Sequence, residues 1–125
     1  MLATELRIGN IVKNNKPRYK DNILVIESIG YNDKVNIFYR EYPICDLEPI
    51  TLTEEWLLKL GFEKPTNEKP YHFKISAVEF LHSEYQNQLK CFNGNMPLFS
   101  MNCEYVHQLQ NIFFALTNKE LTPLY

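Results

Sequence analysis

The segment ITLTEEWLLKLGF (Ile50–Phe62) carries the clearest local structural signal in this 125-residue chain. Thr53 is a good helix N-cap, because its hydroxyl can accept a hydrogen bond from a free backbone N–H. The two glutamates that follow it favour the positive end of a helix dipole. Gly61 suits the left-handed position after a helix, which would let Phe62 fold back on Leu57. The sequence therefore predicts a short helix that separates two strand-rich parts of the chain.

The residues before this helix predict several short strands. Gly9-Asn10 is a turn signal in front of an apolar pair, and Ile23–Ile29 is a run rich in β-branched residues. Lys34–Tyr39 partly alternates between apolar and polar residues, and Pro43 interrupts the pattern. Short strands joined by tight turns predict either a small curled sheet or an SH3-like barrel, with an open meander as the plainer alternative.

The residues after the helix begin with a linker rich in proline and charge, residues 63–70, and then predict a second antiparallel sheet. Asn93-Gly94 is a good hairpin signal between its last two strands. Three or four strands are expected here, drawn from the segments Tyr71–Ser76, Ala77–Glu84, Gln88–Phe92 and Pro97–Met101.

The last regular element predicted is a C-terminal helix, at roughly Cys103–Leu116. Asn102 is its expected N-cap, and Met101 is expected to pack on Val106 just inside the helix. One apolar stripe recurs at helical spacing and should face a core; it consists of Val106, Leu109, Phe113 and Leu116.

These elements together predict an α+β protein. Its N-terminal part, residues 1–50, is expected to be strand-rich, and residues 51–125 are expected to hold the short helix, an antiparallel sheet and the C-terminal helix. A chain of 125 residues is long enough to bury a core without a disulfide or metal, so the two parts are expected to share one core.

The side of the C-terminal helix opposite its apolar stripe is the first candidate site. It carries His107, Gln110, Asn111 and Phe114. A solvent-exposed face is the ordinary explanation of such a row. However, Asn and His are mediocre helix formers, and Phe114 does not suit a face that meets only water. Carboxamides pair with bases or with peptide backbone, so the row is also a candidate partner-binding face.

A basic loop is the second candidate site. It contains Lys13, Lys16, Arg18, Tyr19 and Lys20. Cations around an aromatic ring suit a phosphate backbone and single-stranded bases, although most charge runs are only solvated loops. The whole chain has a net charge of −2, but residues 1–40 hold seven lysines and arginines against four acids. A local nucleic-acid contact is therefore compatible with a chain that is not basic overall.

The cysteines do not form a recognised motif. Cys45, Cys91 and Cys103 are odd in number and lack a CxxC pair, which argues against a disulfide framework and a zinc ribbon. Cys103 and His107 are four residues apart, so on a helix they could share a metal ion or act as nucleophile and base. No third orienting residue and no zinc-finger spacing accompany them, and the chain has no P-loop, GxGxxG, GxSxG or HExxH motif. The sequence predicts no metal, no cofactor and no enzyme activity.

The last pattern is carried by three stretches, LRIGN (Leu6–Asn10), PITLTEEWLLKLGF (Pro49–Phe62) and YVHQLQNIFFALTNKEL (Tyr105–Leu121). Together they resemble a family of small bacterial and prophage-borne proteins that has no assigned activity. The family has a glycine where this chain has Asn118, and asparagine also tolerates the left-handed conformation, so the helix end should be kept. The resemblance implies a mobile-element or phage context and supplies no mechanism.

These observations favour a non-catalytic binding or adaptor module of a mobile element or prophage, contacting nucleic acid or another protein. The main alternative is a structural protein that forms homo-oligomers through the C-terminal helix or a sheet edge, and a small Cys-dependent enzyme is the least favoured. The N-terminus lacks the basic and apolar regions of a signal peptide, and no apolar run is long enough to span a membrane. We therefore expect a cytoplasmic protein without a membrane partner.

Overall fold

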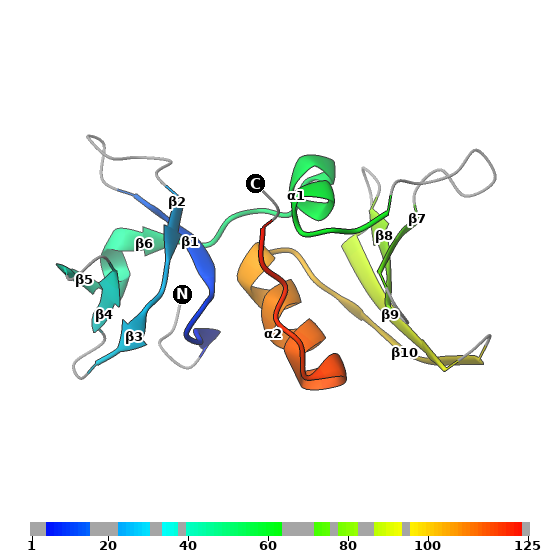
Figure 1. Cartoon of the computed structure of the whole chain (residues 1–125). Helices are drawn as coiled ribbons and strands as arrows, with labels where there is room; N and C mark the ends of the chain where they lie inside the picture. The colour runs from blue at the N-terminus through cyan, green and yellow to red at the C-terminus, as the bar shows by residue number, and fades with distance from the viewer. Residues whose placement is uncertain are drawn as a thin grey trace. The chain divides into compact units, whose positions relative to one another are not determined.

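The computed structural model describes residues 5–15, 23–30, 34–37, 40–63, 72–75, 78–82, 87–93 and 96–123 (Figure 1). The fold is α+β, as predicted: the described strands form three small antiparallel sheets, accompanied by two α-helices. The chain divides into two compact units. Unit 1 comprises Met1–Thr51 and Tyr105–Glu120, and unit 2 comprises Leu52–Glu104 and Leu121–Tyr125.

Unit 1 contains two three-stranded sheets. The first has the order β2-β1-β6, and the second has the order β3-β4-β5. Their strands are β1 (Ile11–Asn14), β2 (Ile23–Val25), β3 (Ser28–Ile29), β4 (Lys34–Ile37), β5 (Arg40–Pro43) and β6 (Leu47–Glu48), with a short 3-10 helix, η2 (Ile44–Asp46), before β6. The described strands do not close into a barrel, so the architecture fits the curled-sheet alternative.

The predicted strand Ile23–Ile29 is split between the two sheets of unit 1. The Ile26 N–H donates to Asn10 O (3.0 Å), which continues the pairing of β2 with β1. One residue later, the Glu27 N–H donates to Asn36 O (3.0 Å), which starts the pairing of β3 with β4. The β-branched run is therefore extended as predicted, but it changes partners halfway and serves two sheets.

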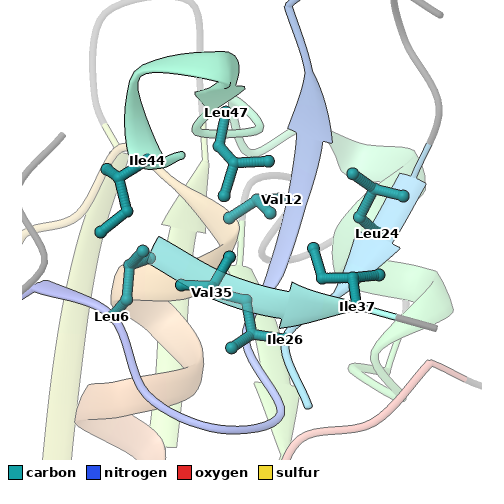
Figure 2. Close-up of a cluster of buried hydrophobic side chains, with 8 residues drawn as sticks. All are labelled: Leu6, Val12, Leu24, Ile26, Val35, Ile37, Ile44 and Leu47. Atoms are coloured by element: carbon teal, nitrogen blue, oxygen red, sulfur yellow. The ribbon is translucent and has the colours of Figure 1, made fainter. Parts of the chain in front are cut away.

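The core of unit 1 forms where these two sheets meet the chain segments around them (Figure 2). Strand β4 alternates strictly, with Val35 and Ile37 buried and Lys34 and Asn36 exposed. Fully burying an aliphatic side chain of this size contributes about 1.5–3 kcal/mol. The cluster consists of Leu6, Val12, Leu24, Ile26, Val35, Ile37, Ile44 and Leu47.

Helix α1 (Glu54–Lys59), in unit 2, confirms the best-specified prediction. The Trp56 N–H donates to Thr53 Oγ1 (3.2 Å), so Thr53 is the N-cap. Gly61 has a φ of 96°, the left-handed conformation that favours glycine. The Phe62 N–H then donates to Leu57 O (3.0 Å), and the Gly61 N–H donates to Leu58 O (3.1 Å). These two bonds make up the predicted Schellman end of the helix.

The sheet of unit 2 has a strand in each of the four predicted segments. Its order is β10-β9-β8-β7, and every neighbouring pair is antiparallel. The strands are β7 (His72–Ile75), β8 (Val78–His82), β9 (Asn87–Asn93) and β10 (Met96–Asn102). Asn93 pairs with Met96, so the strands on either side of the predicted Asn-Gly turn do form a hairpin.

Helix α2 (Val106–Thr117) begins later than predicted. Met101 and Asn102 belong to strand β10 and do not cap or staple the helix. Its N-cap is Tyr105, whose N–H donates to Gln108 Oε1 (3.2 Å), and the Val106 N–H donates to Ile50 O (2.9 Å). A backbone carbonyl from a distant part of the chain thus satisfies a helix-start donor, which no pattern near Asn102 could indicate.

The end and the packing of α2 follow the predictions more closely. Asn118 has φ 59° and ψ 25°, the left-handed conformation expected at that position. Val106, Leu109 and Phe113 are buried, whereas Leu116, the last residue of the predicted stripe, is exposed. The helix belongs to unit 1, which differs from the expected boundary that kept it with residues 51–125. Neither described helix has the length and apolar character needed to cross a membrane.

Candidate functional site

The LRIGN stretch forms a tight turn that meets the polar side of α2 within unit 1. The Asn10 N–H donates to Arg7 O (3.0 Å), which closes a turn over Arg7–Asn10. Gly9, the third residue of this turn, has a φ of 93°, a conformation that side-chain-bearing residues rarely adopt. The turn directs both the backbone of Gly9 and the side chain of Asn10 towards α2.

Gln110 of α2 is fully buried and bonds to the backbone at the start of β1. Its Oε1 accepts a hydrogen bond from Ile11 N (2.9 Å), and its Nε2 donates to Gly9 O (3.1 Å). One residue of a neighbouring parallel strand would satisfy the same two backbone groups. The Gln110 carboxamide therefore takes the place of a strand at this point of β1.

Asn111 continues the contact one residue further along α2. Its Oδ1 accepts from Asn10 Nδ2 (2.7 Å) and from Arg7 Nε (3.2 Å), while its Nδ2 donates to Glu5 O (2.9 Å). Asn10, itself buried, also accepts the Arg7 N–H at its Oδ1 (2.7 Å). Both carboxamides are thus committed to bonds within the unit.

Phe114 lies on the same row because it supports Arg7. The guanidinium carbon of Arg7 lies 4.3 Å from the centroid of the Phe114 ring, a cation–π arrangement. The two terminal nitrogens of the guanidinium donate to the two carboxylate oxygens of Glu120, with Nη2 3.1 Å from Oε2. This planar fork explains why an aromatic ring stands among polar residues.

His107 is the one polar side chain of the row that makes no hydrogen bond to the described residues. Both of its ring nitrogens are buried and unpartnered among the described residues. Its ring stacks on Tyr105, with centroids 6.0 Å apart, and its Nε2 lies 3.7 Å from Glu5 Oε2. Burial lowers the pKa of His107 below its ordinary value, although the nearby Glu5 carboxylate opposes that shift.

The prediction of a solvent-exposed row on α2 is therefore wrong for His107 and Gln110, which are buried. For the same reason these two residues offer no surface to a binding partner, and half-buried Asn111 and Phe114 are occupied by Arg7 and Asn10. The sequence did contain a signal, because Gln110 and Asn111 stand where better helix formers would suit a wet face, and in the structure Gln110 pairs with a backbone donor and acceptor.

The basic loop lies almost entirely outside the described residues. Lys16, Arg18, Tyr19 and Lys20 are not described, and only Lys13 is placed. Lys13 lies on β1 with its Nζ 3.8 Å from Glu48 Oε2 on the neighbouring strand β6. The proposed nucleic-acid site at residues 13–20 therefore stays a prediction.

The residues considered for metal binding or catalysis do not form a described cluster. Within the described ranges, no group of three or more His, Cys, Asp or Glu side chains is placed to hold a metal ion. Cys103 is buried in unit 2, and its N–H donates to Asn87 O (2.9 Å). Cys45 is exposed.

The open edge of strand β10 is a candidate site that the sequence did not single out. β10 is an end strand of its sheet and pairs with β9 alone among the described strands. Its seven residues, MPLFSMN, include no ionisable side chain. Met96 is 66% exposed and Met101 is 41% exposed. Ser100 and Asn102, on either side of Met101, are also exposed. Edge strands usually carry charges that prevent further pairing, and β10 carries none.

The other edge of the same sheet is protected. On β7, the Glu63 N–H donates to Lys74 O (2.8 Å), so a preceding segment already occupies part of that edge. Lys74 is exposed and supplies a charge there. On the β10 side, the Leu52 N–H donates to Glu104 O (2.9 Å) just beyond the strand, and no described strand pairs with the outer edge of Met96–Asn102 itself.

The hydrogen-bonding direction of the β10 backbone follows from its register. The Cys103 N–H donates to Asn87 O. Met101, two residues before Cys103, lies opposite Leu89, two residues after Asn87. Because bonded residues alternate in an antiparallel pair, Met101 also faces β9. The N–H and C=O groups of Ser100 and Asn102 therefore face away from β9, towards the open edge.

No protein-family model matches this chain, and no curated protein or solved structure is similar enough to it to count as a match.

Proposed function

We propose that this protein is a non-catalytic binding module that accepts an extended polypeptide strand along the β10 edge. The observation that carries the proposal is the uncharged edge of β10, where the backbone groups of Ser100 and Asn102 face away from the sheet. An added strand would satisfy these groups and gain main-chain hydrogen bonds, the mode of recognition known as β-augmentation.

A row of apolar side chains that reaches this edge supports the same proposal. Phe73, Phe80 and Leu89 lie opposite one another on β7, β8 and β9 and are buried. Met101 is the next member of the row, opposite Leu89, and it is 41% exposed. A strand added beside β10 would extend the row by one position and cover Met101, which contributes apolar burial in addition to hydrogen bonds.

The test is selection from a displayed library of random linear peptides. Ser100→Pro removes the outward N–H without removing a bond to β9, whereas Ser100→Ala keeps that N–H and loses only the hydroxyl, which Gln88 Nε2 contacts at 3.3 Å. We expect wild type and Ser100→Ala to enrich peptides with alternating apolar residues and Ser100→Pro to lose them. At concentrations where wild type is monomeric, equal enrichment by Ser100→Pro and wild type would refute strand addition at this edge.

Nucleic-acid binding through Lys13, Lys16, Arg18, Tyr19 and Lys20 remains a second proposal, supported by the excess of cations in residues 1–40. It predicts an electrophoretic shift of single-stranded DNA or RNA at low salt that weakens when Lys16, Arg18 and Lys20 become Glu. Binding unchanged by the three substitutions would exclude this loop. The mobile-element context implied by the resemblance and the expected cytoplasmic location also remain proposals.

A further inference from the structure

We propose that the strand accepted at the β10 edge is β10 of a second copy of this chain, paired antiparallel about a two-fold axis. This inference rests on the proposed function and specifies the partner. A two-fold contact of this kind is closed, because each copy contributes the same surface and the β10 edge is then occupied in both copies.

The charge pattern of the edge favours a second copy. Because Met96–Asn102 includes no ionisable side chain, antiparallel self-pairing places no like charges opposite each other. Lys90 on β9 lies opposite Ser100, and it has Glu79 opposite it on β8. The positive charge therefore has an acid beside it within its own sheet.

The apolar pattern is also self-complementary. Each copy ends its buried row with a partly exposed Met101 and therefore needs an apolar surface in the same place. The partner's β10 supplies one, because a two-fold axis perpendicular to the sheet keeps the two apolar faces continuous. Two four-stranded sheets would then become one continuous sheet.

The geometry of β10 limits the pairing to its second half. The register shifts between Pro97 and Phe99, which marks a bulge, and Pro97 has no N–H to donate. Both features blunt the beginning of the edge. The segment Phe99–Asn102 is regular, and it contains both outward-facing residues, so we place the two-fold contact there.

The decisive experiment is sedimentation equilibrium of the full chain over a wide concentration range. We expect wild type and Ser100→Ala to be dimers and Ser100→Pro to have a dimer dissociation constant raised about tenfold or more, because the symmetry removes the same donor from both copies. Circular dichroism and thermal unfolding verify that each variant is folded. If Ser100→Pro does not fold, a second matched pair decides.

That second pair is Met101→Lys and Ile29→Lys. Both residues are 41% exposed on edge strands, Met101 on β10 of unit 2 and Ile29 on β3 of unit 1. Met101→Lys should dissociate the dimer by placing two like charges at the contact, and Ile29→Lys should leave it intact. A dimer that survives Met101→Lys would overturn the assignment to β10.

The outcomes separate this inference from the proposed function. A strictly monomeric wild type that still selects peptides in a Ser100→Pro-sensitive manner overturns the second copy as partner and keeps strand addition. A monomer that selects no such peptides overturns both.

Discussion

The polar side of α2 and the edge of β10 can be compared by how each treats strand backbone groups that have no strand partner. On α2, Gln110 bonds a backbone N–H and a backbone C=O of the β1 region, so two strand groups without a strand partner are satisfied inside unit 1. On β10, the corresponding groups of Ser100 and Asn102 meet no described strand. The difference shows that the same backbone requirement is met by a side chain in one place and is left available in the other.

The largest loss of stability is expected when the backbone partner that Gln110 supplies is removed. Gln110→Leu leaves the buried Ile11 N and the half-buried Gly9 O without their Gln110 partners, which should cost about 3 kcal/mol of the unfolding free energy. Chemical denaturation measures the loss, and hydrogen exchange at the Ile11 amide locates it, because that amide should lose its protection.

The matched control is the same substitution at a glutamine whose side chain, among the described residues, hydrogen-bonds to another side chain and not to the backbone. Gln88→Leu, on β9, removes the contact of Nε2 with Ser100 Oγ and should cost less than about 1 kcal/mol. Equal losses in the two variants would contradict the structural role assigned to Gln110.

The comparison also shows how much of the molecule could be predicted. The caps of α1 were predicted residue by residue, because Thr53, Gly61 and Phe62 act on atoms within a few positions of themselves. The start of α2 was missed, because Ile50 O, far along the chain, receives the Val106 N–H. The split of Ile23–Ile29 was missed for the same reason, since the partners of Ile26 and Glu27 lie on different strands.

The candidate site was predicted only in outline. The composition of the α2 row showed that it was not ordinary helix surface, but Gln110 and Ile11 are 99 positions apart, and local patterns do not show which distant element a side chain meets. The β10 edge was missed because an edge is a property of strand order. Nothing in the letters MPLFSMN shows that β10 would lie at the end of its sheet.

A smaller effect on stability, confined to one range of pH, is expected from His107 on α2. His107 is buried, its ring nitrogens make no hydrogen bonds to the described residues, and its pKa is lowered mainly by burial. The folded state therefore binds a proton at His107 less readily than the unfolded state does. The stability that this difference contributes is present above the unfolded-state pKa of 6.5 and is lost as the pH falls from there through the lowered folded-state pKa.

The measurement is the unfolding free energy of wild type and two variants across this range of pH. His107→Gln should flatten the wild-type dependence, whose slope from one group cannot exceed about 1.4 kcal/mol per pH unit. Glu5→Gln removes the carboxylate that raises the pKa of His107, so the pH dependence contributed by His107 should become stronger. A dependence that is unchanged in both variants would show that His107 is not the group responsible. A weaker dependence in Glu5→Gln would show that the carboxylate 3.7 Å from Nε2 does not favour the protonated ring.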